Sequence, residues 1–193
     1  MQKRDLLDKL YSEYQIEFKG EEIVLGEGNA DTKILLIGEA PGKDEVKLSR
    51  PFVGMAGKNL NEFLDILGLD RQSIYITNAI KYRLSKINQD TGRIINRPAT
   101  TEEIKRNIPY LHREISIIKP ETVITLGNVP LKAVTEDNGI SIGAVHGAIQ
   151  RLSLLENEYK LYPLYHPASV IYNQSLKETY IEDIKRLKDL GIV

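Results

Sequence analysis

The chain has 193 residues, of which 41% are hydrophobic, and its 26 Lys and Arg against 27 Asp and Glu give a formal net charge of −1. This length and balance predict one globular domain, residues 1–193, with enough apolar side chains for a buried core. No cysteine is present, which excludes disulfides, thiolate nucleophiles and thiolate metal centres, and the three histidines lack metal-ligand spacing, so no metal is expected.

Helical and strand patterns alternate from the start of the chain. Leucines at helical spacing over residues 4–14 predict an opening helix. The apolar run at residues 33–37 predicts the first central strand, and the apolar spacing over 60–67 predicts a helix that ends at Gly68. Residues 73–77 predict a second strand.

The middle of the chain contains a long polar segment, residues 82–99, which we expect to be an exposed excursion. Thr100 can cap the helix that follows, which runs through Ile118 and is ended by Pro120. Residues 122–126 predict the third strand.

The last part of the chain predicts a short helix containing Leu131 and Val134, a loop or edge strand at 140–149, a fourth strand at 159–165 and a closing amphipathic helix at 178–190. Four strands that alternate with helices predict an α/β fold, a three-layer α/β/α sandwich with a central four-stranded, mainly parallel sheet.

Polar groups follow three of these strands. The turn at residues 38–42 contains Glu39, Asn78 follows the second strand, and His166 follows the fourth. The carboxyl ends of parallel strands meet at one edge of a sheet, so these groups predict a shared pocket. Taken singly, each fits an ordinary turn: a solvated Glu, an Asn that caps a turn, and a structural His before a proline.

Five motifs, in order and spacing, resemble the uracil-DNA glycosylase superfamily, especially its family 4, over roughly Leu25 to the C-terminal helix. They are Gly38-Glu39-Ala40-Pro41-Gly42, Arg50-Pro51-Phe52-Val53-Gly54-Met55-Ala56-Gly57, Ile76-Thr77-Asn78-Ala79-Ile80-Lys81, Thr125-Leu126-Gly127 and His166-Pro167-Ala168-Ser169. The resemblance implies a monofunctional enzyme that hydrolyses the N-glycosidic bond of uracil in DNA after base flipping and leaves an abasic site. It would act in base excision repair, and no cofactor is expected.

The resemblance and the chemistry together assign the catalytic roles. Glu39 is expected to orient or deprotonate the attacking water, and His166 to donate a hydrogen bond to O2 of the departing uracil. The backbone of the turn, through Gly38, Ala40 and Gly42, is expected to assist.

The remaining substrate contacts concern the flipped base. Phe52 is expected to stack on it, and the Asn78 carboxamide matches the O4 acceptor and the N3–H donor of uracil. Glu45 is expected near C5, where it would reject the methyl group of thymine, and Asp44 is an alternative for this role.

The expected partner is DNA that contains uracil, bound by a cytoplasmic monomer. A near-neutral net charge argues against a strongly basic nucleic-acid binder but allows a local basic rim. No apolar run has membrane-spanning length and no signal peptide opens the sequence, so no membrane partner is expected. The candidate DNA contacts are Arg50, Lys58, Lys81, Arg83 and Ser169, and the alternative is an ordinary solvated basic loop.

Apolar side chains after Ser169 are candidates for a wedge that enters the minor groove, or for the buried face of a short helix. They are Val170, Ile171 and Tyr172.

The sequence also departs from family 4, whose best-known members carry an iron–sulfur cluster on four cysteines. Here those positions fall near Tyr11, Tyr14, Tyr82 and Asn107, so aromatic and polar packing is expected to provide the cross-link instead. The segment 84–96 is longer than expected and contains no histidine, so the covalent capture of uracil known for one relative is not expected.

Three other interpretations stay open at this point. The chain could be a glycosylase-fold protein that binds nucleic acid or a free base with little turnover. It could be a glycosylase for another deaminated base, hypoxanthine or xanthine. It could be a flavodoxin-like or nucleotide-binding domain whose glycine turns hold phosphate, although that would leave Asn78 and His166 without a role.

Overall fold

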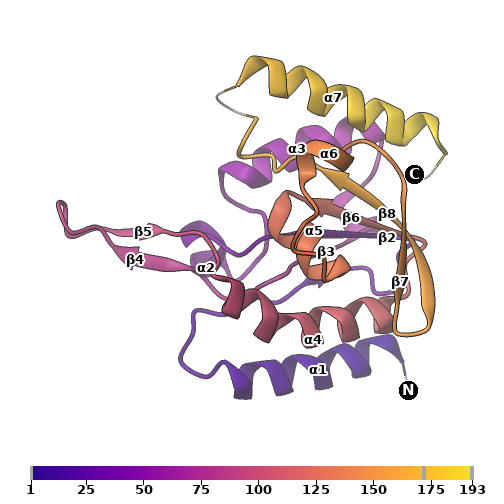
Figure 1. Cartoon of the computed structure of the whole chain (residues 1–193). Helices are drawn as coiled ribbons and strands as arrows, with labels where there is room; N and C mark the ends of the chain where they lie inside the picture. Colours follow the sequence, from indigo (N-terminus) through magenta and orange to yellow (C-terminus); the bar gives the residue numbers. More distant parts are fainter. Residues whose placement is uncertain (1, 171–172, 192–193) are drawn as a thin grey trace.

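The computed structural model describes residues 2–170 and 173–191. Its main sheet has six strands in the order β1-β3-β2-β6-β8-β7 (Figure 1). These strands are β1 (Glu27–Gly28), β2 (Ile34–Gly38), β3 (Tyr75–Asn78), β6 (Thr122–Leu126), β7 (Gln150–Leu154) and β8 (Asn157–Leu164). The helices are α1 (Lys3–Glu17), α2 (Lys43–Leu48), α3 (Met55–Leu67), α4 (Thr101–Ile118), α5 (Asn128–Thr135), α6 (Ile142–Val145) and α7 (Gln174–Asp189), with a 3-10 turn, η1, at Arg71–Ser73.

The sheet is mainly parallel, as predicted, but it is wider than predicted. The four predicted strands are β2, β3, β6 and β8, and they run parallel to one another. The short strands β1 and β7 add antiparallel edges to β3 and β8. The expectation of four strands was therefore wrong. A two-residue strand carries no periodicity that a sequence pattern could reveal, and β7 starts at Gln150, just beyond the predicted loop or edge strand at 140–149.

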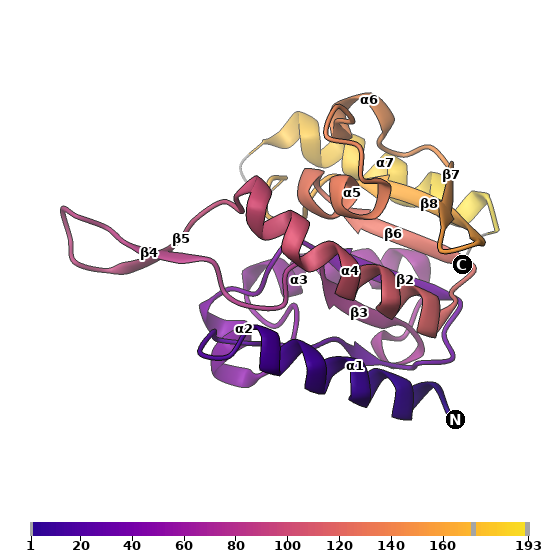
Figure 2. The same ribbon diagram turned by 60° about the horizontal axis from the view of Figure 1, so that its bottom comes forward.

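Helices cover both faces of the sheet, which confirms the three-layer sandwich (Figures 1 and 2). Successive residues of β2 serve both layers: Leu35 and Ile37 pack with α1, α4 and α5, whereas Ile34 and Leu36 pack with α3 and α7. A strand buried on both faces reads as a continuous apolar run, as this one does. None of the helices within the described ranges is long and apolar enough to cross a membrane.

Local signals identified several helix ends correctly. Gly68, the predicted stop, ends α3 at φ +71°, a left-handed conformation that glycine adopts without strain. Thr100 caps α4: its side chain accepts the Glu103 N–H at 3.2 Å, and the Glu103 carboxylate accepts the Thr100 N–H at 2.9 Å. The helices α2 and α6 are too short for their periodicity to predict them.

The predicted excursion after β3 contains a hairpin that projects from the body of the molecule in both views (Figures 1 and 2). Its strands are β4 (Ser85–Ile87) and β5 (Ile94–Asn96), which pair antiparallel with Ile87 opposite Ile94. The hairpin forms its own two-stranded sheet and adds no strand to the main one.

Three of the four positions expected to replace a cluster ligand lie together. The Tyr14 hydroxyl donates to Asn107 Oδ1 at 2.5 Å, and the rings of Tyr14 and Tyr82 share a small apolar cluster with Phe18. The Tyr11 hydroxyl instead bonds elsewhere, to Tyr75 at 2.7 Å. Phenols and a carboxamide are not the thiolate donors that iron–sulfur clusters require, so these residues do not fit such a group.

Candidate active site

A pocket of about 340 Å³ opens beyond the carboxyl ends of β2, β3 and β8. This is where parallel α/β sheets place their sites, and the volume lies within the usual range for ligand pockets. The lining residues are Ala40, Pro41, Gly42, Lys43, Asp44, Glu45, Phe52, Gly54, Met55, Ala56, Asn78, Asn96, His166 and Ala168. Six of the eight residues predicted to contact substrate or to act in catalysis thus share one cavity; Gly38 and Glu39 lie next to it.

Gly38 lies behind the pocket wall, at the end of β2. A Cβ at this position would overlap the Phe52 ring and lie 2.5 Å from Asn78 Oδ1. Because glycine has no side chain, Phe52 and Asn78 can approach the backbone of β2 closely.

Asn78 ends β3 and is 3% exposed. Its backbone carbonyl accepts the Lys81 ammonium at 3.0 Å, but no group in residues 2–170 or 173–191 bonds to its side-chain carboxamide. Asn78 lines the cavity, where a ligand with a complementary donor and acceptor can hydrogen-bond to its carboxamide. The side chain is therefore available for recognition.

His166 follows β8, which lies on the other side of β2 and β6 from β3, and it lines the same pocket as Asn78. The Ala168 N–H donates to its Nδ1 at 3.1 Å, so the neutral ring carries its proton on Nε2, which has no partner in the described part of the chain. Burial lowers the pKa of His166 to about 4, which keeps the ring neutral at pH 7. The site thus presents a neutral N–H donor.

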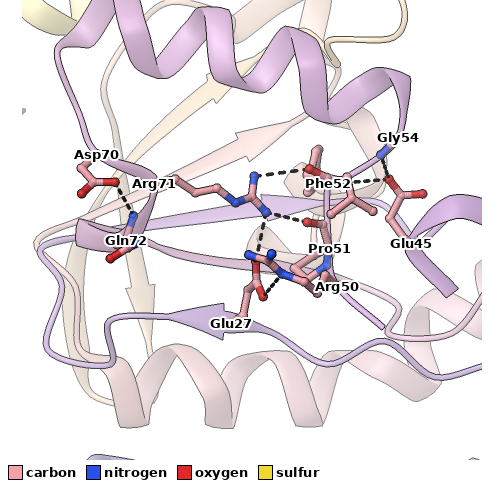
Figure 3. A network of polar contacts seen from close by, with 10 residues as sticks. Glu27, Glu45, Arg50, Pro51, Phe52, Gly54, Asp70, Arg71 and Gln72 are labelled. Carbon is pink, nitrogen blue, oxygen red and sulfur yellow. Dashed lines mark hydrogen bonds and ion pairs between the residues drawn. The ribbon is translucent and has the colours of Figure 1, made fainter. Parts of the chain in front are cut away.

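Phe52 lies in a loop that is anchored by a partly buried arginine (Figure 3). The Arg71 guanidinium donates to the carbonyls of Pro51 at 2.6 Å and Phe52 at 3.3 Å, and it also bonds to Glu27 at 3.1 Å. These bonds hold Phe52 at φ +51°, a conformation that is uncommon for a bulky residue. Its ring stacks against His166, with centroids 6.3 Å apart and the planes 29° apart.

Glu45, in α2, connects this loop to the turn after β2. One carboxylate oxygen accepts the N–H groups of Val53 at 3.0 Å and Gly54 at 2.7 Å, and the other accepts that of Gly42 at 3.1 Å (Figure 3 shows the bond to Gly54). The side chain thus shapes the pocket wall. Rejection of the thymine methyl by Glu45 or Asp44 stays a prediction.

The Glu39 side chain is half-buried beside the pocket, outside the set of residues that line it. Burial raises the pKa of its carboxyl group, and a hydrogen bond from the Ala99 backbone opposes part of that rise. The neighbouring residue, Ala40, does line the cavity. A bound water could therefore connect the Glu39 carboxylate to a reacting atom in the pocket.

The expectation that Lys81 contacts DNA was wrong. Lys81 is 1% exposed, and its ammonium lies 2.7 Å from the fully buried Glu114 carboxylate of α4. Glu114 also accepts the hydroxyls of Tyr11 and of Thr77, the latter at 3.2 Å. A lysine whose charge is paired inside the core cannot reach a phosphate, because losing the pair would leave a buried charge without a partner.

The other predicted DNA contacts lie at the surface to different degrees. Lys58 and Ser169 are exposed, and the Ser169 hydroxyl donates to the His166 carbonyl at 2.7 Å. Arg50 is exposed but forms two bonds to Glu27, at 2.9 and 3.1 Å. The Arg83 side chain is only 7% exposed and donates to Asn96 at 3.2 Å.

The proposed wedge is only partly described. Val170 is buried with residues of α3 and α7, which agrees with the alternative of a buried face and contradicts its role as a wedge. Ile171 and Tyr172 lie outside the described residues.

Two functional residues escaped the sequence analysis. Asn96 reaches the pocket from the end of β5, and Arg71 holds the Phe52 loop from η1. Neither position carries a local signal, since an exposed Asn in a polar segment and an Arg after Asp70 are common. Their roles depend on which distant segments the fold brings beside them.

Comparison with known proteins identifies a family that matches most of the chain. The model of the uracil DNA glycosylase superfamily matches residues 25–188. The chain is 39% identical over 173 residues to a type-4 uracil-DNA glycosylase of Sulfurisphaera tokodaii. The aligned region covers 88% of this chain and 74% of that protein. Type-4 uracil-DNA glycosylases of Saccharolobus solfataricus (36% over 170 residues; 86% and 74% covered) and Archaeoglobus fulgidus (35% over 170 residues; 86% and 81% covered) are also similar.

Proposed function

The chain belongs to the uracil-DNA glycosylase superfamily, and from this premise we propose that its pocket binds a uracil flipped out of DNA and that Asn78, His166 and Glu39 recognise and release it. The protein is a hydrolytic N-glycosylase that excises uracil from DNA in base excision repair. The observation that carries the site assignment is that a buried carboxamide and an imidazole N–H, both without partners, line one cavity.

Recognition of the base is assigned to Asn78. Its amide group can donate to O4 and its oxygen can accept from N3–H of uracil, whereas cytosine presents the opposite pattern at these two positions. Flipping the nucleotide costs a few kcal/mol of pairing and stacking, and contact of the base with Phe52 would recover part of that cost.

Release of the base is assigned to His166 and Glu39. Cleavage of the N-glycosidic bond leaves negative charge on uracil O2 and positive charge on the sugar. The neutral Nε2–H of His166 is a preorganised hydrogen-bond donor that stabilises the negative charge on O2. The Glu39 carboxylate orients the attacking water, takes its proton and stabilises the cationic sugar.

Further parts of the proposal concern the protein as a whole. It is proposed to be a single domain that acts as a monomer. It is proposed to need no cofactor, because neutral donors can stabilise the uracil anion. A cytoplasmic location is proposed because the substrate is DNA.

The first test is incubation with an oligonucleotide that contains one uracil, single-stranded and paired with G or A, followed by alkali to break abasic sites. We expect scission at the uracil and none in matched oligonucleotides with thymine or cytosine. Binding without scission would contradict hydrolysis and support the binding-only alternative. Scission only at hypoxanthine or xanthine would overturn the assigned base.

The pH dependence of the reaction provides a second prediction. Glu39 acts as a carboxylate with a raised pKa, so kcat/KM should fall as pH drops through a midpoint above 4.5. His166 is neutral above about pH 4, so the rate should not fall between pH 6 and 9. Glu39→Gln should lower the plateau and remove the acid limb. Loss of activity as pH rises through 6 to 7 would show that His166 works as an imidazolium instead.

A further inference from the structure

The hairpin of β4 and β5 projects from the body of the molecule (Figures 1 and 2) and contributes to neither of the two large cores. Its base is connected to the pocket: Asn96, the last residue of β5, lines the cavity, and Arg83 donates to Asn96 Oδ1 at 3.2 Å. A molecule that fills the pocket and extends out of it on this side must therefore pass the hairpin.

The hairpin exposes an apolar cross-strand pair. Ile87 and Ile94 face each other in register and are 61% and 59% exposed, and the neighbouring Ile95 is 36% exposed. An isolated two-stranded hairpin is marginally stable in water unless something packs against it. Ile87 and Ile94 form one apolar face of the projection, a surface that a partner would cover, whereas Ile95 lies on the opposite face, across from Lys86.

The charges of the hairpin favour a polyanion as that partner. Lys86 and Arg93 have no carboxylate partner within the described ranges, whereas Arg83 and Arg97 at its base are paired, the latter with Glu103 at 2.6 Å. Asp90 is the only acidic residue between positions 85 and 96. The projecting part thus carries two unpaired cations against one anion.

Hydrogen bonds at both ends hold the hairpin in shape. At the tip, Asn88 Oδ1 accepts the N–H groups of Asp90 at 2.9 Å and Thr91 at 3.1 Å. At the base, the Arg97 N–H donates to the Leu84 carbonyl at 3.1 Å. Because these hydrogen bonds preorganise the hairpin, it loses less conformational entropy on binding than a flexible loop would.

We propose that the hairpin is a DNA-binding arm that contacts the strands beside the flipped nucleotide, with Lys86 and Arg93 on phosphates and Ile87 and Ile94 in a groove. The proposal rests on the proposed function, since it extends the DNA from the uracil pocket. A two-stranded ribbon fits the major groove, and apolar side chains can wedge into the minor groove. Continuity with the pocket and the two unpaired cations favour DNA over a protein partner.

The test compares the wild type with the variant Lys86→Ala/Ile87→Ser/Arg93→Ala/Ile94→Ser on two substrates: a long duplex with one central uracil and a uracil-containing trinucleotide. On the duplex we expect at least a tenfold rise in Kd, measured by fluorescence anisotropy, and in KM, with an unchanged single-turnover rate at saturation. On the trinucleotide, which has few phosphates beyond the pocket for Lys86 and Arg93 to bind, we expect less than a threefold change.

Salt dependence tests the phosphate contacts separately. The logarithm of the DNA-binding constant falls linearly with the logarithm of the salt concentration. Loss of two phosphate contacts should make this slope less steep by about 1.8. The matched control, Lys33→Ala/Lys160→Ala, removes two lysines at the opposite end of the parallel strands and should leave the duplex Kd unchanged. Unchanged far-ultraviolet circular dichroism of the hairpin variant would show that its fold is intact.

The outcomes separate the two proposals. Equal binding of the duplex by the hairpin variant and the wild type would overturn the DNA-binding arm, whatever the chemistry, and would leave a protein partner as the explanation for the exposed isoleucines. Duplex binding by the wild type without cleavage would instead contradict the proposed function, while the anisotropy difference would still report on the hairpin.

Discussion

His166→Ala should slow the release of uracil about 10²- to 10³-fold in single-turnover experiments, while Kd for uracil-containing duplex changes less than tenfold. The Ala168 N–H holds Nδ1, and burial keeps the ring neutral, so Nε2–H is positioned before the reaction begins. The loss of one preorganised donor to a developing oxyanion typically costs about 2.7 to 4 kcal/mol of transition-state stabilisation. The ground-state oxygen carries less charge, so binding depends less on this donor.

The informative second variant is His166→Gln, whose amide can still donate. It should recover part of the lost rate, because the transition state needs a donor and not a proton transfer from the ring. A rate for His166→Ala within threefold of the wild type would contradict the assignment. An equal loss in Kd and in rate would show instead that His166 mainly holds the pocket together, through its contact with Phe52.

Glu114→Gln should lower the free energy of unfolding by about 3 to 5 kcal/mol, because it leaves the Lys81 ammonium buried without a counter-charge. The substitution keeps the size of the side chain, so the loss reflects charge and not a cavity. Urea denaturation followed by circular dichroism measures it. Lys81→Met should also destabilise the protein, since the Glu114 carboxylate would then lack its cation.

The double variant Lys81→Met/Glu114→Leu distinguishes a charge effect from a packing effect. Replacement of both members of a buried pair by apolar residues is often neutral, so the double variant should be more stable than either single one. Arg113→Ala is the control on the same helix, because it breaks the exposed pair with Glu13 and should destabilise the protein far less than Glu114→Gln does. A small loss in Glu114→Gln, comparable to that of the control, would contradict the prediction.

The buried pair also connects stability to the pocket. Lys81 bonds to Glu114 and to the Asn78 carbonyl at once, so the core charge holds the end of β3 where Asn78 faces the cavity. The same carboxylate accepts the Tyr11 hydroxyl from α1. The opening helix is thus held to β3 and α4 by polar contacts inside the core.

Much of the fold follows from local patterns in the sequence. The apolar runs of β2 and β6, the cap at Thr100 and the stop at Gly68 each depend on residues close together in the chain, and the structure has them where they were predicted. The shared position of Asn78 and His166 also follows, because the carboxyl ends of parallel strands meet at one edge.

Other features depended on contacts between distant segments. Lys81 and Arg83 lie two positions apart and look alike in the sequence, yet the first is buried against Glu114 and the second lies at the base of the hairpin beside Asn96. The sequence by itself determined the α/β layers, the strand-end pocket and the family. Only the tertiary structure decided which charges are paired inside the core, which residues anchor the Phe52 loop, and that β4 and β5 form a projecting hairpin. The physical reason is that hydrophobic periodicity and capping act between near neighbours, whereas the burial of a charge depends on the partner that folding brings to it.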